Sequence, residues 1–376
     1  MIAVLYGRDF APFAESAVYD ICAAAEEAGG TVRPLSLEAA LADPMLRGEV
    51  RRLYVLPFDP PKSARIELRA EPIATFLKSL FPRVEIVNSL VAHELCWDKL
   101  DTEQRLVNRG VPVPDTLVTS EPAEVYEFVR QHDLAILKQR SGCGGQGHIV
   151  VWIEDGRLMG DAGSRPYEID LAAAGQPRLL AERLSYPAPF YLQRLLGEQS
   201  GGEFLPGQML RAYVIDGQIG FWTERYRDHY RRPSDWIINI ARGAKYRFVL
   251  NVSEEAKKLA LRAADVVGAR VAAVDILRSS AGLRVLEVDT DGYHMMIDRQ
   301  FKLIPDYRGF FNLDRFIAEA LLAEPAVPVR RVVEPEESAP RSPRPRSSAP
   351  PARPRRPGPM GRGKPRTQPP RRGRSR

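Results

Sequence analysis

A glycine-rich segment in the first half of the chain has the composition of a phosphate-binding loop. Four of the six residues from 142 to 147 are glycines; the segment comprises Gly142, Gly144, Gly145 and Gly147, with Gln146 among them. Without Cβ atoms, such a loop can bring backbone N–H groups close to phosphate oxygens, and Lys138 on the preceding strand adds a positive charge. No Gly-Lys-Ser/Thr ends the loop and no helix follows it, which excludes a Walker A loop and a Rossmann turn. A flexible hairpin loop is an equal alternative at this point.

Three carboxylates in the second half of the chain have the spacing of a metal site. Asp275 lies on one predicted strand, and Glu287 and Asp289 lie two residues apart on the next, so the latter two point to the same face. Carboxylates that converge repel one another unless a cation lies between them. Oxygen ligands favour Mg²⁺ or Mn²⁺ over zinc. A solvated acidic strand face is the alternative, but the apolar residues on both strands favour the metal.

Charge is divided unevenly along the chain. The net charge of +6 arises from 54 Lys and Arg against 48 Asp and Glu. Residues 338–376 contain 13 basic residues, 11 prolines and no acidic or aromatic residue, which leaves 41 basic and 48 acidic side chains in the first 337 residues. Such a tail cannot bury enough apolar surface to offset its ordering entropy, so we expect it to be disordered. Its charge suits contact with RNA, DNA, ribosomes or acidic proteins, and a solubilising extension without a partner is the alternative.

Cysteine content and hydropathy exclude several protein classes. Cys22, Cys96 and Cys143 are widely spaced and odd in number, which argues against a disulfide framework. No apolar run approaches the roughly 18–20 residues of a membrane span. The segment 1–7 has the pattern of a buried strand and lacks the basic leader of a signal peptide. We therefore expect a cytoplasmic protein without a membrane segment.

The elements that must position these residues follow from the apolar pattern. The first 90 residues predict strand 2–6, helix 13–27, strand 52–58, helix 66–80 and strand 84–87. A β-α-β-α-β order indicates a small, mostly parallel sheet with helices on its faces.

The remaining body has a mixed α/β and α+β pattern. One helix is expected over residues 93–110, and another over 253–267 with Ser253 as its N-cap. Asp216-Gly217, between the apolar runs 210–215 and 218–226, is the strongest hairpin signal in the chain. The other predicted elements are the helices 121–131 and 313–322 and the strands 135–139, 149–153, 190–196, 271–277 and 283–289.

In their order and spacing, these segments resemble the ATP-grasp superfamily, and in particular its ribosomal-protein glutamate ligases, glutathione synthetase and amino-group-carrier lysine-biosynthesis ligases. The resemblance covers residues 90–320. The matching pieces are Asp98-Lys99 and 110–114; Lys138 with the loop 142–147; the hinge strand 192–196; Arg211 before Asp216-Gly217; Asn239-x-x-Arg242-Gly243; and Asp275 followed by Glu287-Val288-Asp289.

The resemblance implies a fold and a domain division. A small parallel α/β domain over residues 1–90 would precede an ATP-grasp domain over 91–325, whose two subdomains clasp ATP. Residues 326–376 would be the disordered basic tail.

The resemblance also implies residue roles. Lys99, Lys138 and the loop Gly142, Gly144, Gly145, Gln146 and Gly147 would contact ATP phosphates, while Gln193, Arg194 and Leu195 would line the adenine slot. The carboxylates Asp275, Glu287 and Asp289 would hold Mg²⁺ or Mn²⁺. The transferring phosphoryl group or acyl-phosphate would be stabilised by Arg211, Arg225, Asn239 and Arg242.

Several residues depart from the family pattern. Arg194 and Asp289 stand where Glu and Asn are usual, and Leu210 precedes the strand arginine where an acidic residue is frequent. Residues 290–294 replace the usual Pro-Gly. The ATP half of the site therefore matches the family better than the acceptor half.

The expected activity is ATP-dependent carboxylate–amine ligation through an acyl-phosphate. An amino-acid, peptide or protein carboxylate and an amine acceptor would be the substrates. Two alternatives stay open: a ribosome- or nucleic-acid-associated binding protein on a catalytically altered ATP-grasp fold, and a phosphotransferase that makes no amide. The retained Lys138 and carboxylates favour the ligase.

Overall fold

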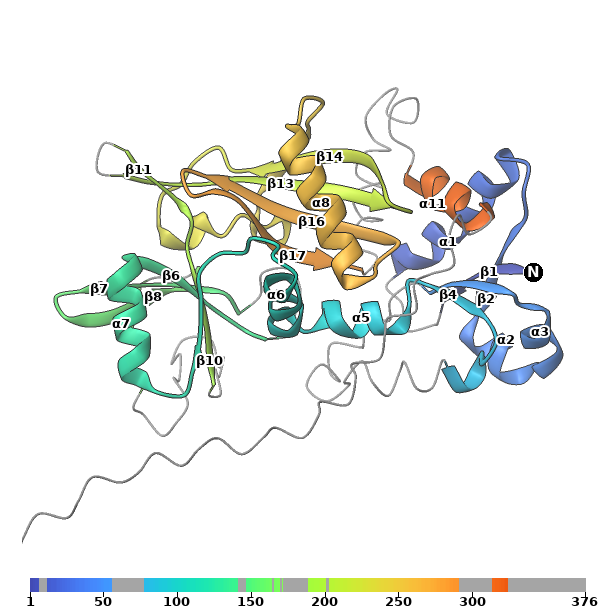
Figure 1. Ribbon diagram of the computed structural model, residues 1–376, viewed down its shortest axis with the longest axis horizontal. Coiled ribbons are helices and arrows are strands. Elements are labelled where there is room, and N and C mark those ends of the chain that lie inside the picture. The colour runs from blue at the N-terminus through green and yellow to red at the C-terminus, as the bar shows by residue number, and fades with distance from the viewer. Residues whose placement is uncertain are drawn as a thin grey trace, which may run out of the picture. The chain divides into compact units, whose positions relative to one another are not determined.

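The computed structural model describes residues 1–6, 12–55, 78–140, 147–163, 166–169, 171, 189–200, 203–290 and 313–323 (Figure 1). These residues form sheets of four, six and five strands and a short two-stranded hairpin. The mixed α/β and α+β class predicted from the sequence is confirmed. The tail expected over residues 326–376 lies outside the described residues, and the domain division stays a prediction.

The N-terminal sheet is parallel throughout, in the order β2-β1-β3-β4. It consists of β1 (Ile2–Tyr6), β2 (Val32–Ser36), β3 (Arg52–Val55) and β4 (Glu85–Val87), with the helices α1 (Pro12–Glu27), α2 (Leu37–Ala42) and α3 (Pro44–Glu49). The edge strand β2 was not predicted, because Arg33 and Pro34 interrupt its apolar pattern; proline is tolerated at a sheet edge. The helix expected over 66–80 lies almost wholly outside the described residues.

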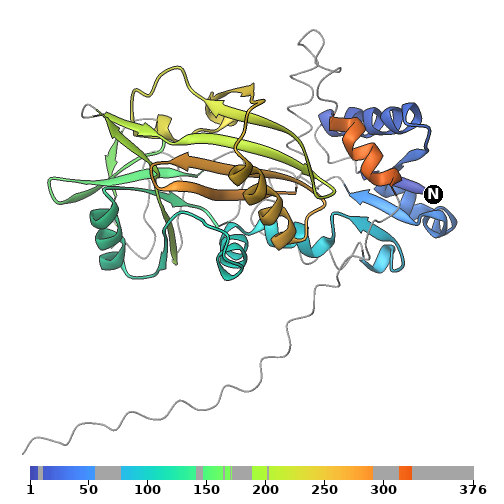
Figure 2. The same cartoon turned by 45° about the horizontal axis from the view of Figure 1, so that its top comes forward.

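Both faces of this parallel sheet are covered by apolar residues. Ala3 and Leu5 of β1 belong to one buried cluster, and Ile2 and Val4 belong to another. The second cluster includes α11 (Leu313–Leu322), which lies beside α1 although the two helices are far apart in sequence (Figure 2). The helix predicted over 313–322 is thus confirmed.

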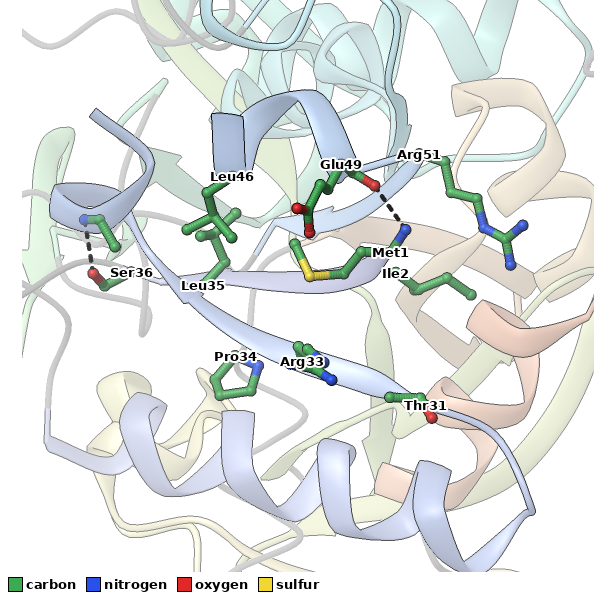
Figure 3. A pocket seen from close by; sticks show the side chains of 11 residues that line it. Met1, Ile2, Thr31, Arg33, Pro34, Leu35, Ser36, Leu46, Glu49 and Arg51 are labelled. Atoms are coloured by element: carbon green, nitrogen blue, oxygen red, sulfur yellow. Dashed lines mark hydrogen bonds between the residues drawn. The ribbon is translucent and has the colours of Figure 1, made fainter. Parts of the chain in front are cut away.

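A pocket of about 560 Å³ opens beside the edge strand β2 (Figure 3). Apolar side chains such as Leu35 and Leu46 and the basic residues Arg33 and Arg51 line it. None of the predicted site residues borders this pocket. The predicted chemistry is therefore located elsewhere.

The six-stranded sheet has the order β5-β10-β6-β7-β8-β9 and is antiparallel. Its strands are β5 (Thr116–Thr119), β6 (Leu134–Lys138), β7 (Ile149–Glu154), β8 (Arg157–Asp161), β9 (Tyr167–Glu168) and β10 (Phe190–Arg194). Helix α7 (Pro122–His132) packs on one face through Val125 and Val129. The helix and strands predicted in this region are confirmed.

The five-stranded sheet has the order β15-β14-β13-β16-β17 and is also antiparallel. Its strands are β13 (Gln208–Ile215), β14 (Gln218–Tyr226), β15 (Lys245–Phe248), β16 (Val271–Ser279) and β17 (Gly282–Asp289). Helix α8 (Glu254–Val267) covers one face (Figure 1) and is capped by Ser253, as predicted. Asp216 and Gly217 have φ values of 50° and 74°, which suit the predicted hairpin turn.

Several short elements precede β13 or follow β14. The polar segment before Gly207 forms a hairpin of β11 (Gly197–Ser200) and β12 (Glu203–Pro206). Two 3₁₀ turns, η1 (Pro233–Trp236) and η2 (Ile240–Arg242), follow β14. Among the helices of the described ranges, none is both long and apolar enough to cross a bilayer.

The single helix expected over residues 93–110 is wrong. The structure has two helices, α5 (Leu90–Trp97) and α6 (Lys99–Asn108), separated at Asp98. Asp98 is extended, and its carboxylate accepts hydrogen bonds from the backbone N–H groups of Leu100 and Asp101 at 3.0 and 3.2 Å. An aspartate that satisfies these donors ends one helix and begins the next. As a result, Lys99 is the first residue of α6.

Candidate active site

Charged residues form a row across β13, β16 and the edge strand β17 of the five-stranded sheet. The register places Arg211 of β13 opposite Asp275 of β16, and Asp275 opposite Glu287 of β17. The neighbours of Asp275 in sequence, Val274 and Ile276, belong to the apolar cluster under α8. The charged row therefore occupies the face of the sheet turned away from α8.

A β-bulge sets which face Glu287 occupies. Ile276 pairs with Val285 whereas Asp275 pairs with Glu287, so Leu286 is an extra residue in β17. Val285 and Val288 both belong to the cluster under α8, although they are three residues apart. In a regular strand, Glu287 would share the face of Val285. The bulge instead places Glu287 on the face of Asp275.

Two arginines bind Asp275 in the interior. Nε and Nη2 of Arg211 donate to the two carboxylate oxygens of Asp275 at 2.6 and 2.8 Å, and Nη1 of Arg225 donates to Oδ2 at 3.2 Å. Nη2 of Arg211 also reaches Oδ2 of Asp289 at 3.0 Å. Although burial opposes it, Asp275 and Asp289 hold the pKa of Arg211 well above its usual value.

The other two predicted metal ligands differ in charge environment. Burial opposes ionisation of Glu287, yet the Lys99 ammonium, 2.6 Å from Oε1, with Arg211 and Lys138, lowers the pKa of Glu287 below its usual value. Burial and the charge of Glu287 raise the pKa of Asp289 to about 6. An additional cation here would relieve the repulsion between the two carboxylates.

The donor set suits a hard divalent cation, although the carboxylates are not gathered around a common point. Within the ranges that the structure describes, no three His, Cys, Asp or Glu side chains form a metal-binding group. Both oxygens of Asp275 accept hydrogen bonds from arginine. Glu287 and Asp289 supply the oxygen ligands that Mg²⁺ prefers, and they are better placed than Asp275.

Lys138 lies at the end of β6, beside residues of β10. It is buried, and its Nζ donates to Oε1 of Gln193. Burial lowers the pKa of Lys138 to about 8; Glu103 and Glu287 oppose this effect, and Lys99 adds to it. The structure thus brings both predicted lysines near Glu287.

Two residues of this site were missed from the sequence. Glu103 of α6 is buried and accepts hydrogen bonds through Oε2 from Tyr191 Oη and Gln193 Nε2, both at 2.8 Å. Glu103 is four residues after Lys99 and thus on the same helix face, while Tyr191 and Gln193 alternate on β10. These spacings are the signals that could have identified Glu103 and Tyr191.

Arg194 and Leu195, the other two residues predicted to line the adenine slot, differ in burial and in their contacts. Leu195 is buried, and its backbone N–H donates to Leu134 O at 3.1 Å. Arg194 is partly exposed and pairs with Asp115 through Nη1 at 3.2 Å. Both the side chain and the backbone N–H of Arg194 therefore contact Asp115.

Among the residues predicted to stabilise the phosphoryl group, Arg225 keeps an unused donor, whereas the Arg242 side chain binds backbone carbonyls. Nε of Arg225 is buried and has no hydrogen-bond acceptor among the described residues, so it is a donor available to an anion. Nη2 of Arg242 instead donates to the carbonyls of His148 and Ala162 at 3.0 and 3.2 Å. The backbone N–H of Arg242 donates to the backbone oxygen of Asn239, which is half-buried. Arg242 therefore connects the segment after β14 to the six-stranded sheet.

Most of the glycine loop lies outside the described residues. Gly142, Gly144, Gly145 and Gln146 belong to this undescribed part. Gly147 has a φ of 72°, and a Cβ atom there would lie 2.6 Å from the Gln139 side chain, so glycine is required. His148 follows; burial, with Lys138, Lys99 and Arg242, holds its pKa well below the usual value. His148, immediately before β7, is therefore surrounded by three basic side chains.

Comparison with solved structures identifies the fold. ATP-grasp ligase PsnB bound to a minimal precursor matches with a TM-score of 0.53 and 20% identity, covering 85% of this chain and 97% of that one. A Chryseobacterium gregarium RiPP-associated ATP-grasp ligase, in complex with ADP and a leader and core peptide, matches with a TM-score of 0.54 and 14% identity, covering 85% and 96%. The chain has an ATP-grasp fold. The resemblance noted from the sequence is confirmed.

Sequence comparison places the family match in the second half of this ATP-grasp fold. Residues 199–306 match the RimK-like ATP-grasp domain. The tetrahydromethanopterin:alpha-L-glutamate ligase of Methanocaldococcus jannaschii is 25% identical over 214 residues, which are 57% of this chain and 65% of the relative. A probable alpha-L-glutamate ligase of Shewanella pealeana is 42% identical over 84 residues, 22% and 17% of the two chains. The chain thus spans less than two thirds of the length of these curated relatives.

Proposed function

We propose that this ATP-grasp protein is an ATP-dependent carboxylate–amine ligase. The observation that carries the proposal is the charged row of Arg211, Asp275 and Glu287, with Lys99 bound to Glu287 and a buried Arg225 donor unused. Phosphoryl transfer depends on positioning and charge neutralisation more than on covalent chemistry from the protein. A set of fixed cations beside carboxylates suits that requirement.

The reaction has two steps. A substrate carboxylate oxygen attacks the γ-phosphorus of ATP, the bond to the β-phosphate oxygen breaks, and an acyl-phosphate and ADP form. An amine then attacks the acyl carbon, the C–O bond to phosphate breaks, and an amide, phosphate and a proton are released. Lys99 and Lys138 would hold the ATP phosphates, and Arg211 and Arg225 would stabilise the charge on the transferred phosphoryl group.

Mg²⁺, or Mn²⁺, would be held by Glu287 and Asp289, with Asp275 behind them. When bound, it would neutralise charge on the nucleotide phosphates. A PsnB structure with a TM-score of 0.51 contains Mg and ADP together with the minimal precursor, which supports this assignment by analogy of fold. Gln193, Arg194 and Leu195 would border the base.

The substrate class is an amino acid or peptide. The names of the sequence relatives make L-glutamate the first amine to test, and those of the structural neighbours make peptides the first source of the carboxylate to test. We also propose a cytoplasmic location, with contact to RNA, ribosomes or acidic proteins confined to the basic tail.

The test is ADP release by the full chain with Mg·ATP, measured over a panel of amino acids and of acidic and basic peptides, with products identified by mass spectrometry. We expect release that depends on both a carboxylate and an amine and yields an amide. Release of ADP with a phosphorylated product and no amide would favour a phosphotransferase. ATP binding without release under any combination would favour a binding protein.

A further inference from the structure

Glu103 is a buried carboxylate close to the proposed nucleotide site. It is 8% exposed and lines a small internal pocket together with Lys99, Leu286 and Glu287. Among the ion pairs of the described residues, none includes Glu103. Burial of a carboxylate is costly, and the two hydrogen bonds that Glu103 accepts from neutral groups offset its desolvation only in part. Such a group is retained at a cost in stability, which indicates a role.

The partners of Glu103 connect it to Lys138. Oε2 accepts from Nε2 of Gln193 at 2.8 Å, and Oε1 of the same amide accepts from Nζ of Lys138. Gln193 is 1% exposed. A single side chain thus joins the carboxylate of α6 to the ammonium of β6.

The chemistry of the two ends determines the orientation of Gln193. An ionised carboxylate only accepts hydrogen bonds, and an ammonium only donates them. The amide must therefore turn its NH₂ to Glu103 and its oxygen to Lys138. With a neutral group at position 103, the Lys138 ammonium alone would keep the amide oxygen turned toward it, and the amide NH₂ would lose its charged acceptor, so Gln193 would be held less firmly.

Tyr191 strengthens the same arrangement. Its hydroxyl donates to Oε2 of Glu103 at 2.8 Å, and the Lys138 ammonium lies 5.9 Å from the centre of its ring. Tyr191 and Gln193 are two residues apart on β10, so their side chains point to the same face of the strand. Tyr191 therefore holds Glu103 and packs beside Lys138 at the same time.

We infer that Glu103 is a positioning residue, which acts through Gln193 and Tyr191 to aim the Lys138 ammonium at the nucleotide phosphates. This inference rests on the proposed function. An ammonium has three N–H donors; one is directed to Gln193, which leaves the others for phosphate oxygens. The negative charge of Glu103 also favours the charged form of Lys138 against burial.

The experiment is a double-mutant cycle on nucleotide affinity. Binding of Mg·ADP and Mg·ATP to the full chain is measured by calorimetry for wild type, Glu103→Gln, Lys138→Met and the double variant. We expect Glu103→Gln to weaken binding about tenfold in the wild-type background and by less than twofold in the Lys138→Met background, because its effect passes through Lys138. Glu127→Gln, the same change at an exposed site on α7, should bind as wild type.

A milder variant covers the case in which Glu103→Gln does not fold. Tyr191→Phe keeps the ring and removes one donor to Glu103, so we expect an affinity loss of about threefold that also disappears when Lys138 is Met. Equal losses in both backgrounds, or wild-type affinity in Glu103→Gln, would overturn the inference while leaving the ligase proposal standing. Absence of nucleotide binding in wild type would overturn both.

Discussion

The N-terminal parallel sheet and the five-stranded antiparallel sheet use their two faces differently. In β1, Ala3 and Leu5 pack on one side and Ile2 and Val4 on the other, so both faces are apolar. In β13, Leu210 and Ala212 pack under α8, whereas Arg211 faces a buried carboxylate. A parallel sheet covered on both sides has no face left for charged chemistry, while an antiparallel sheet can keep one.

The candidate site therefore depends on a sheet that packs apolar residues under α8 on one face and keeps charged residues on the other. The charged face is still largely dry, since Arg211 is 2% exposed and Asp275 is 3% exposed. Electrostatic interactions are stronger in such surroundings than in water, but an unpaired charge there is also more costly. Substitutions on the two sheets should therefore separate activity from stability.

The largest expected effect is on the charged face. Glu287→Gln removes the charge that binds Lys99 and a proposed Mg²⁺ ligand, so amide formation should fall by about a thousandfold or more, as for loss of a group acting on the transition state. The melting temperature should change little, because the residue is not part of the core. Steady-state ADP release measures the turnover, and calorimetric unfolding measures the melting temperature. Glu168→Gln on the exposed strand β9 is the control, and wild-type turnover in Glu287→Gln would refute the site.

The second largest effect is expected at the ion pairs of Asp275 with Arg211 and Arg225 on the same face. Asp275→Asn leaves Arg211 and Arg225 without their buried carboxylate and should cost about 3–5 kcal/mol of unfolding free energy. Replacing all three by apolar residues, Arg211→Met with Arg225→Met and Asp275→Leu, should regain most of that stability without regaining activity. Urea unfolding of the single and triple variants tests this. A triple variant as unstable as Asp275→Asn would show that the charges hold the sheet together.

A core substitution in the parallel sheet should have the opposite profile. Leu5→Ala creates a cavity at a fully buried position and should lower the unfolding free energy by about 2–5 kcal/mol. Turnover per folded molecule, measured well below the melting temperature, should stay within twofold of wild type. A large fall in kcat with stability intact would place part of the chemistry on the N-terminal sheet.

The smallest effect expected is a pH dependence that only the charged region can show. Burial lowers the pKa of Lys138 from 10.5 to about 8, so the ammonium that binds phosphate is lost as pH rises through 8. Glu103 and Glu287 raise the Lys138 pKa and Lys99 lowers it, and His148 nearby has a pKa held well below its usual value, so it is neutral over this range. Mg·ADP affinity should fall about tenfold from pH 7 to pH 9. Lys138→Arg should remove this dependence, and an identical profile in both proteins would assign it to another group.

Local signals in the sequence were sufficient for most of the elements. Ser253 and the apolar period of α8, the Asp216-Gly217 turn and the runs forming β16 and β17 are properties of short segments, and their predictions are confirmed. The apolar pattern failed in two places, once because of a tertiary strand pairing and once because of a local helix cap. β2 is a strand despite Arg33 and Pro34 because β1 pairs with it, and 93–110 is divided because Asp98 caps α6.

By itself, the sequence determined which residue types are present, their order along the chain, and hence the resemblance to an ATP-grasp protein. Only the tertiary structure decided how the charges are paired. The bulge at Leu286 turned Glu287 to the face of Asp275, and the break at Asp98 put Lys99 at a helix start beside Glu287. The network from Glu103 through Gln193 to Lys138 joins residues up to 90 positions apart. Such contacts depend on strand register and helix placement, which no local pattern contains.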